Sequence, residues 1–307
     1  MMTMNQGEAH GRPVSVLGTG TMGSAMARNL IRGGLHTTVW DRSGSALSAL
    51  AKLGAHTSSS AEEALRNAQV VITMLPTAEA VNDVLFATGA VKAFSHGAVW
   101  AQMGTIGVHE TKDVADRLAH SRPDVMFVDA PVSGSRGPAT AGELLILASG
   151  PREADAVLQP AFAAIGRKTV WLGEAGQGSR MKLAVNAYMA ILIEGVAEAL
   201  ELATRFGVDP ASLAEAIEGG PLDAPIADAK LHKMESRDFD TEFALQWALK
   251  DVDLALSEAG NDPPPLLAAL SPFWHAAVAA GHGREDVSIA STMLRPRGGA
   301  APGRHVS

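Results

Sequence analysis

The chain has 307 residues, of which 33 are acidic and 25 basic, for a formal charge of −8, and it contains no cysteine. At about 100 to 200 residues per domain, this length predicts two domains, each with a core of its own. The absence of cysteine excludes disulfides, thiolate metal sites and a thiol nucleophile. Because no histidines have metal-ligand spacing and the basic residues form no block, we expect no metal site and no nucleic-acid partner.

The two ends of the chain have little apolar character. Residues 1–12 are polar, and residues 295–307 combine proline, glycine and arginine without apolar periodicity, so we expect both to be disordered tails. No signal-peptide pattern is found near the start. The longest apolar run, Leu183–Val196, is broken by Asn186 and Glu194 and is shorter than the ~20 residues that span a bilayer. We therefore expect a cytoplasmic protein with no membrane partner.

Between Pro13 and about Gly173, short apolar runs alternate with segments of helical period. This alternation is typical of βαβ units and predicts a doubly wound α/β domain with a mostly parallel sheet over residues 13–175. The expected strands are Val14–Leu17, Thr37–Trp40, Val70–Leu75, Ala98–Ala101, Val125–Val128, Leu144–Ala148 and Thr169–Leu172. The expected helices are Met22–Ile31, Ala61–Arg66, Ala78–Phe86, His109–His120 and Glu153–Ile165.

The alternation ends after Gly173. Apolar residues then recur at spacings of three and four over Gly178–Phe206, which predicts one long helix that joins two domains. The remainder, to Leu294, is interrupted only by glycine and proline and is expected to be helical. We place the domain boundary near Gly176, so that residues 176–294 form an all-helical second domain.

A glycine-rich turn, Gly18-Thr19-Gly20-Thr21-Met22-Gly23, lies directly after the first expected strand and directly before a helix. In this pattern the first glycine permits a tight turn, the second lets the backbone approach a pyrophosphate, and the third lets helix and strand pack closely. Asp41 ends the second strand, near the ~20 residues at which an acid usually meets the adenosine ribose. These features predict a dinucleotide site.

The residues around Asp41 give conflicting signals about which nicotinamide dinucleotide binds. Asp41 suits a free ribose 2′-hydroxyl, whereas Arg42 and Ser43 offer a charge and a hydroxyl to a 2′-phosphate. Arg42 could also be no more than a solvated loop cation. The balance favours NADP(H), with NAD(H) as the alternative.

A second turn, Asp129-Ala130-Pro131-Val132-Ser133-Gly134-Ser135, follows the carboxyl end of an expected strand, where open α/β sheets bind ligands. Backbone N–H groups and hydroxyls in such a turn can bind a carboxylate. A simple strand-ending turn explains the same residues equally well.

Lys182 and Asn186 lie four residues apart at the start of the long helix, so they share one face of it. A lysine between Met181 and Leu183 is expected to be partly buried. Its ammonium group could stabilise the negative charge that hydride transfer builds on a carbonyl oxygen, and could supply the proton. Lys182 is therefore the candidate general acid, although a lysine with only its stem buried is the commoner case. Further along, Lys250 borders an apolar helix face and resembles an ordinary helix charge.

Taken in order, these segments resemble the β-hydroxyacid dehydrogenase family, which includes 3-hydroxyisobutyrate dehydrogenases, tartronate semialdehyde reductases and glyoxylate or succinic semialdehyde reductases. The resemblance covers about Pro13 to Leu294. The family motifs G-x-G-x-x-G-x-x-M, M-L-P, D-A-P-V-S-G-G, G-x-G-x-x-x-K-x-x-x-N and K-D correspond to Gly18–Met26, Met74–Pro76, Asp129–Ser135, Gly176–Asn186 and Lys250-Asp251.

The resemblance implies a Rossmann domain joined by a long helix to a helical domain of the 6-phosphogluconate dehydrogenase type, in a homodimer or homotetramer without metal. It implies that Lys182 is the catalytic acid and base and that Asn186 assists at a small anionic substrate. It also implies two sets of binding residues. For the cofactor they are Gly18, Gly20, Thr21, Met22, Gly23, Asp41, Arg42, Ser43, Met74, Leu75, Pro76, Thr105 and Lys250; for the substrate they are Ser133, Gly134, Ser135, Lys182 and Asn186.

The chain departs from the family pattern at several positions. Ser135 replaces the second glycine of the substrate motif, Pro138 stands where a glycine is usual, Ala187 replaces a second asparagine, and Gln102–Thr105 stands for a more usual D-x-S-T. These departures do not change the expected reaction class, but they leave the substrate undetermined. Two alternatives are an imine reductase-like NADPH enzyme, against which Lys182 argues, and a catalytically silent dinucleotide-binding module.

Overall fold

The computed structural model describes residues 12–44 and 46–294. The expected tails, 1–12 and 295–307, lie outside the described residues except for Arg12. The chain forms two compact units, Met1–Val185 and Asn186–Ser307, which are described separately below.

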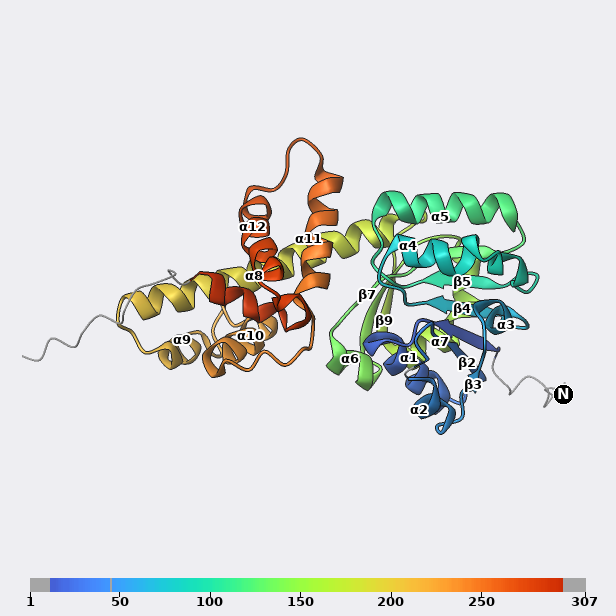
Figure 1. The fold of residues 1–307 in the computed structure, drawn as a ribbon, viewed down its shortest axis with the longest axis horizontal. Coiled ribbons are helices and arrows are strands. Elements are labelled where there is room, and N and C mark those ends of the chain that lie inside the picture. The colour runs from blue at the N-terminus through green and yellow to red at the C-terminus, as the bar shows by residue number, and fades with distance from the viewer. Residues whose placement is uncertain (1–11, 45, 295–307) are drawn as a thin grey trace, which may run out of the picture. The chain divides into compact units, whose positions relative to one another are not determined.

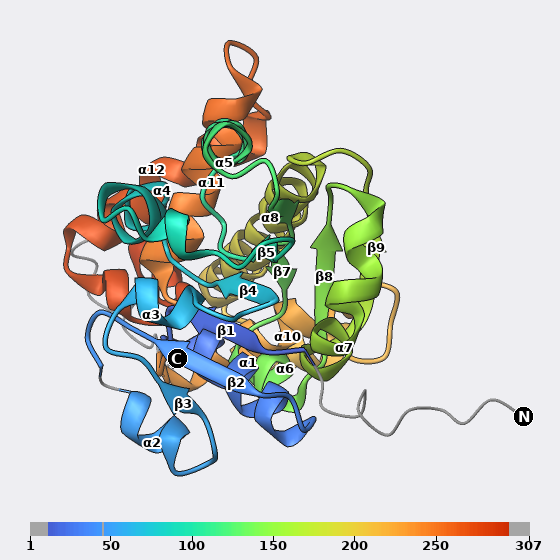
Figure 2. The ribbon, with the colours of Figure 1, turned by 90° about the vertical axis from the view of Figure 1, so that its right-hand side faces the viewer.

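Unit 1 is built on a six-stranded sheet with the strand order β3-β2-β1-β4-β5-β6, in which every neighbouring pair is parallel (Figures 1 and 2). The strands are β1 (Val14–Leu17), β2 (Thr37–Trp40), β3 (His56–Thr57), β4 (Val70–Thr73), β5 (Val99–Gln102) and β6 (Met126–Asp129). The strand order reverses direction between β1 and β4, which is the switch point where such sheets bind ligands. The predicted α/β fold with a mostly parallel sheet is confirmed.

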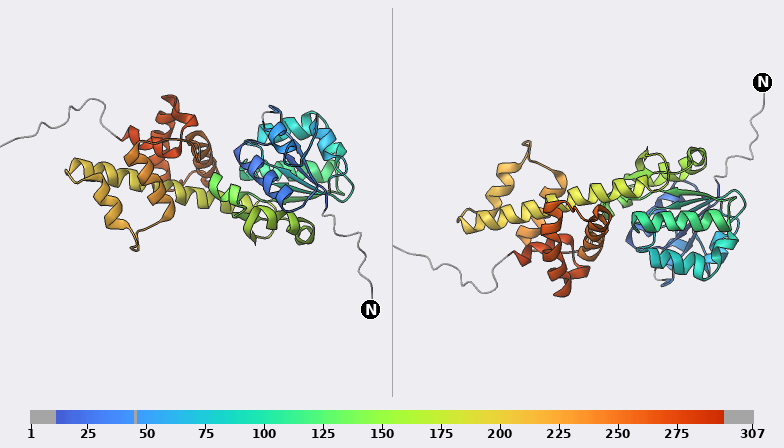
Figure 3. Two further views of the ribbon diagram at one scale, coloured as in Figure 1. Left: turned by 90° about the horizontal axis from the view of Figure 1, so that it is seen from below. Right: turned by 90° about the horizontal axis from the view of Figure 1, so that it is seen from above.

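Helices cover both faces of this sheet (Figure 3). They are α1 (Thr21–Arg32), α2 (Leu47–Ala51), α3 (Ala61–Leu65), α4 (Ala78–Val81), η1 (Asn82–Ala87), η2 (Ala90–Ala93), α5 (Val108–Ser121), α6 (Arg136–Ala141), η3 (Arg152–Ala154) and α7 (Asp155–Ile165). The helix expected over Ala78–Phe86 is α4 continued by a π-helical turn, η1.

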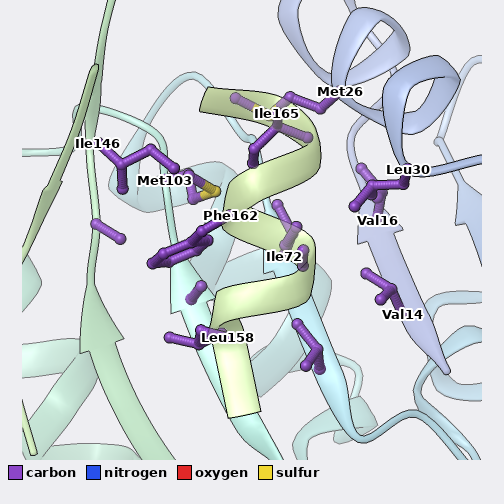
Figure 4. Close-up of a cluster of buried hydrophobic side chains, with 14 of the residues drawn as sticks. Val14, Val16, Met26, Leu30, Ile72, Met103, Ile146, Leu158, Phe162 and Ile165 are labelled. Carbon is purple, nitrogen blue, oxygen red and sulfur yellow. The ribbon is translucent and has the colours of Figure 1, made fainter. Parts of the chain in front are cut away.

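Alternation along the strands divides the apolar side chains of unit 1 between two cores. Val14, Val16 and Ile72 face α1 and α7, as Figure 4 shows together with Leu158 and Phe162 of α7. The intervening strand residues face the other layer, which contains α3 and α5. Both faces are buried, which explains why the strands read as continuous apolar runs rather than as alternating patterns.

A second, three-stranded sheet extends unit 1, with the order β7-β8-β9. Its strands are β7 (Val132–Ser133), β8 (Leu144–Ala148) and β9 (Gly166–Trp171), and β7 runs antiparallel to β8. The sequence did not predict β3 or β7. Each is only two residues long, too short to show any periodicity.

The last paired residues of five strands form one row across the carboxyl edge of the large sheet. Strand register places Trp40 beside Leu17, Leu17 beside Thr73, Thr73 beside Gln102, and Gln102 beside Asp129. The loops that follow the first four of these strands, together with the start of α1, carry the cofactor residues that the sequence predicts in unit 1.

Helix α8 (Gln177–Arg205) is continuous across the division between the units. Unit 2 otherwise comprises α9 (Pro210–Ile217), α10 (Pro225–Ser236), α11 (Leu245–Ala259), α12 (Pro265–Ala279), η4 (His282–Arg284) and η5 (Val287–Met293). Its core surrounds the fully buried Trp274, and a buried ion pair joins Lys230 to Asp286 at 3.0 Å. The predicted long helix and helical second half are confirmed.

By length and composition α8 could also cross a membrane, because an 18-residue window of it has a mean hydropathy of 1.5. Core helices of soluble proteins satisfy the same criteria, and 44% of that window is buried. One such helix supports a membrane span only weakly.

Candidate active site

The glycine-rich turn between β1 and α1 is packed too closely for other residues at two of its three glycines. Gly18 has a φ of +95°, and a Cβ added there would lie 2.6 Å from the carbonyl oxygen of Met74. A Cβ on Gly23 would overlap the carbonyl oxygen of Gly18. At Gly20, the second glycine of the pattern, an added Cβ would meet no atom within 4 Å beyond its neighbouring residues and the helix's own nearby backbone. The turn therefore leaves open space only where the sequence expects a pyrophosphate to approach.

Helix α1 begins at this open position. Gly20 is its N-cap, and no side-chain cap hydrogen bond closes the first turn, which includes Thr21 and Met22. Unpaired N–H groups and the helix dipole together favour an anion at such a position. The residues present thus fit a dinucleotide pyrophosphate.

Asp41, at the end of β2, is held by the chain itself. Its Oδ2 accepts a hydrogen bond from the backbone N–H of Thr19 at 2.8 Å, and its Oδ1 accepts from the N–H and hydroxyl of Ser43 at 2.8 and 2.6 Å. Burial raises the pKa of Asp41, but the hydrogen bonds from Ser43 and Thr19 outweigh burial and leave the pKa below its usual value. Asp41 is therefore an anion that ties the loop after β2 to the glycine-rich turn.

Arg42, between these two tethered residues, is exposed, as is Ser43. The carboxylate of Asp41 is thus engaged within the protein, while the guanidinium beside it lies at the surface. Sequence patterns alone could not show that the carboxylate is engaged while the guanidinium is exposed.

The loops after β4 and β5 are joined by a buried polar chain. The indole N–H of Trp100 donates to the hydroxyl of Thr73 at 2.8 Å, Thr73 donates to Gln102 Oε1 at 2.6 Å, and Gln102 donates from Nε2 to the carbonyl of Gly104 at 2.8 Å. A Cβ on Gly104 would overlap the carbonyl oxygen of Leu75. Gln102 and Gly104 are two of the positions at which the chain departs from the family motif. In this structure they bring the loops after β4 and β5 into contact.

The residues expected on the nicotinamide side lie in these loops. Met74 and Thr105 are half-buried, Leu75 is buried and Pro76 is exposed. All four follow the central strands of the carboxyl edge, two or three strand spacings away from the loop of Asp41.

The predicted substrate turn lies between β7 and α6. Ser133 is half-buried on β7, Gly134 has a φ of +138°, and Ser135 is the N-cap of α6. A Cβ on Gly134 would lie 3.1 Å from Cβ of Pro138. The absence of a side chain at Gly134 therefore leaves room for Pro138.

Lys182 lies in the second turn of α8 and is only 9% exposed. The start of this helix is fixed by Asp129, a fully buried carboxylate that the sequence identified only as the first letter of a motif. Asp129 Oδ2 accepts from the N–H groups of Gly176 and Ser179 at 3.2 and 2.8 Å, and Oδ1 lies within hydrogen-bond distance of the Ser179 hydroxyl, at 2.8 Å from Oγ. Burial raises the pKa of Asp129 above its usual value, although these hydrogen bonds oppose the rise. No local pattern could have linked residues 50 positions apart.

Unit 2 contains the remaining predicted site residues in one cluster. Asn186 donates from Nδ2 to Asp251 Oδ2 at 2.6 Å, and Lys250 Nζ lies 3.1 Å from Asp251 Oδ1. Asn186 and Asp251 are both buried. The sequence did not single out Asp251 as a site residue, although the K-D pair contained it.

The spacing of the strands in unit 1 suits an extended dinucleotide. Gly18 follows β1 and Asp129 ends β6, two strands that are three neighbours apart, which corresponds to about 14 Å at ~4.8 Å per strand. Asp41 lies one strand further out on the opposite side of Gly18. Adenosine beside Asp41, pyrophosphate at Gly20 and nicotinamide beside Met74 and Thr105 would follow this edge in order.

Family models match both parts of the chain. Residues 13–173 match the model of the NAD binding domain of 6-phosphogluconate dehydrogenase, and residues 176–294 match that of the NAD-binding domain of NADP-dependent 3-hydroxyisobutyrate dehydrogenase. Glyoxylate/succinic semialdehyde reductase 2 of Arabidopsis thaliana is 33% identical over 92% of this chain and 79% of its own length.

Two further proteins show the same similarity. L-threonate dehydrogenase of Cupriavidus necator is 31% identical over 90% of this chain and 94% of its own length. The crystal structure of 3-hydroxyisobutyrate dehydrogenase from Salmonella typhimurium superposes with a TM-score of 0.84 at 26% identity, covering 92% of this chain and 100% of that one.

Proposed function

Because the chain belongs to the β-hydroxyacid dehydrogenase family of NAD(P)-dependent oxidoreductases, we propose that it transfers hydride between NADP(H) and a small β-hydroxy acid or its semialdehyde, with Lys182 as general acid and base. The observation that carries this proposal is the burial of Lys182 near the start of α8. The first turn of that helix is hydrogen-bonded to Asp129 at the carboxyl edge of the sheet. When bound, the nicotinamide supplies or accepts the hydride. The chain's own residues orient the substrate and handle the proton.

Lys182 acts on the oxygen at which charge develops. In the reducing direction its Nζ donates a proton to the carbonyl oxygen as negative charge builds there, and in the oxidising direction Nζ accepts the proton of the hydroxyl. Asn186, one helical turn further along the same face, binds the substrate from its amide. Asp251 holds both that amide and the Lys250 ammonium in place.

The substrate is proposed to be a small carboxylate. Ser133, Gly134 and Ser135 present hydroxyls and a strained backbone turn, a combination that suits a carboxylate group. The names of the relatives give glyoxylate, succinic semialdehyde, threonate and 3-hydroxyisobutyrate as their substrates, and each of these is a small carboxylic acid with a carbonyl or hydroxyl group. A panel of such acids would identify the one this enzyme prefers.

We favour NADP(H) over NAD(H) as the cofactor because both carboxylate oxygens of Asp41 are engaged by Thr19 and Ser43. A ribose 2′-hydroxyl would have to compete with these donors. The exposed Arg42 is the cation that a 2′-phosphate would meet at this loop.

The test is a Lys182→Ala variant assayed by the loss of NADPH absorbance with glyoxylate and succinic semialdehyde. We expect kcat to fall at least ~100-fold, the low end for removal of a general acid, while the dissociation constant of NADPH stays within about threefold. Lys168→Ala, which removes an exposed lysine on β9 of the same unit, is the matched control and is expected to keep wild-type kcat. Full turnover by the Lys182 variant would refute the assignment.

The same assay separates the two alternatives. An imine reductase would oxidise NADPH with a cyclic imine but not with the semialdehydes, and a silent dinucleotide-binding module would oxidise it with neither. Lys182 favours the hydroxyacid reaction over both.

We also propose that the enzyme is a homodimer or homotetramer assembled through unit 2. Helix α9 has no buried residue, and large apolar side chains are exposed nearby in the sequence: Leu202 at 50%, Phe206 at 73% and Leu222 at 78%. Such apolar surface is typical of an interface. Sedimentation equilibrium should give a mass at least twice that of one chain.

A further inference from the structure

The first turn of α8 has all of its backbone N–H groups satisfied by distant or preceding residues. Gly176 and Ser179 donate to Asp129 Oδ2, Gly178 donates to the hydroxyl of Ser149 at 2.9 Å, and Gln177 donates to the carbonyl of Glu174 at 3.2 Å. Helix starts are normally capped by a residue next to them in sequence. Here the cap comes from the end of β6, so that strand determines where the helix begins.

Further hydrogen bonds and close backbone packing also hold this turn in place. Ser149 donates to Asp129 Oδ2 at 3.1 Å, and the backbones of residues 129 and 149 are paired by two hydrogen bonds of 2.9 and 2.7 Å. A Cβ on Gly178 would overlap the carbonyl oxygen of Leu147 and lie 3.0 Å from that of Asp129. The helix start is thus pressed directly onto the ends of β6 and β8.

Lys182 follows Ser179 by three residues, so the two share one face of α8. Any shift of the turn that Asp129 holds displaces Lys182 with it. We propose that Asp129 is a positioning residue that fixes the first turn of α8 and thereby places the Lys182 amine at the carboxyl edge of the sheet. This inference rests on the proposed role of Lys182.

The number of hydrogen atoms available for the hydrogen bonds around Asp129 indicates which substitution at position 129 should preserve its positioning role. Asp129 Oδ1, Ser179 Oγ, Thr111 Oγ1 and the carbonyl of Gly107 form a chain of three contacts, of 2.8, 3.1 and 2.6 Å. The two hydroxyls provide two hydrogens, so the third contact is filled only when residue 129 donates as well. A protonated carboxyl group donates in this way, and burial favours that form. An asparagine whose amide oxygen replaces Oδ2 and whose NH₂ replaces Oδ1 would satisfy the same chain.

The experiment compares Asp129→Asn with Asp129→Ala in the full-length enzyme. We expect Asp129→Asn to keep kcat within about threefold, and Asp129→Ala to lower kcat by about tenfold to 100-fold, because a displacement of about 1 Å has an effect of this size. NADPH affinity should stay within about threefold in both variants, since the glycine-rich turn is untouched. Asp124→Ala is the matched control: it removes a carboxylate that precedes the amino end of the same strand β6 and pairs with Arg122, and it should leave kcat unchanged.

A second readout is independent of turnover. Amide hydrogen exchange of Gly176 and Ser179 should accelerate at least about tenfold in Asp129→Ala but not in Asp129→Asn or Asp124→Ala, because the alanine leaves these two N–H groups without their acceptor. If Asp129→Ala does not fold, Ser179→Ala, which removes only the hydroxyl contact, should still show a smaller loss of kcat with faster exchange.

The outcomes separate this inference from the proposed function. A wild-type kcat or unchanged exchange in Asp129→Ala would overturn the positioning role, as would an asparagine variant as impaired as the alanine variant. Absence of turnover in the wild-type enzyme together with the expected exchange pattern would refute the proposed reaction while supporting the tether.

Discussion

Substitution of Arg42 by alanine tests how the loop after β2 selects the cofactor. Thr19 and Ser43 occupy both carboxylate oxygens of Asp41 on the protein side, and Arg42 lies exposed between the two tethered residues. The substitution therefore removes the cation without disturbing the hydrogen bonds that hold the glycine-rich turn. Binding of NADH, which has no 2′-phosphate, should be unaffected.

The size of the effect follows from the exposure of Arg42. A hydrogen bond to a charged group contributes about 1.5–3 kcal/mol, and solvent screening at an exposed site places this contribution near the low end of that range. At about 1.4 kcal/mol per tenfold change, kcat/KM with NADPH should fall about tenfold, and with NADH it should change less than about twofold. Steady-state kinetics with each cofactor at saturating substrate measures both values.

The matched control is Lys52→Ala, which removes an exposed positive charge from the same unit. If the NADPH effect came only from the net positive charge of the unit, both variants would show the same loss of efficiency with NADPH, and this loss relative to the wild type would be larger at low salt. An unchanged ratio of NADPH to NADH efficiency in Arg42→Ala would refute the assignment of the 2′-phosphate to Arg42.

Two further predictions concern the stability of unit 2. Lys230→Met should lower the free energy of unfolding by about 3–5 kcal/mol in urea titration, because it leaves the buried Asp286 without its cation; the double variant with Asp286→Asn should recover part of the loss, and no recovery would contradict the ion-pair explanation. Burial raises the pKa of Glu194 despite a 2.8 Å hydrogen bond from Trp274, so its folded form favours the proton and stability declines as pH rises above the ordinary value of about 4.3. Above that ordinary value, thermal unfolding should therefore show the Tm of Glu194→Gln rising relative to that of the wild type as pH increases, and a constant difference would exclude this cause.

The sequence predicted those parts of the fold that depend on local patterns. Four-residue runs such as Val14–Leu17 and Val70–Thr73 are recognisable because both faces of a parallel sheet are buried. Helix α8 is recognisable because its apolar period persists over 29 residues. Strand β7, two residues long, has no period at all, and the separate sheet that it begins could not be anticipated.

The candidate site likewise has one part that local sequence patterns predict and another part that they do not. The glycine-rich turn was predictable because the backbone geometry of three glycines is encoded within six residues. The destinations of the buried carboxylates were not, since Asp129 bonds to Ser179 and Asp251 bonds to Asn186 across 50 and 65 residues. Such pairs depend on how strands and helices pack in the folded chain, and no spacing in the sequence predicts them.

The departure at Ser135 shows how the substrate can change while the scaffold stays the same. Gly134 has a φ of +138° and needs to be glycine, whereas Ser135 has a φ of −87° and an extended backbone that any residue adopts. Replacing the family's glycine by serine at this position therefore introduces no backbone strain. What it adds is a hydroxyl at the N-cap of α6, beside the turn proposed to bind the carboxylate, and Ser135 forms no side-chain cap there that would occupy it. Because the added group is polar and the backbone is unchanged, the difference between this enzyme and its relatives should appear in the choice of acid rather than in the transfer of hydride.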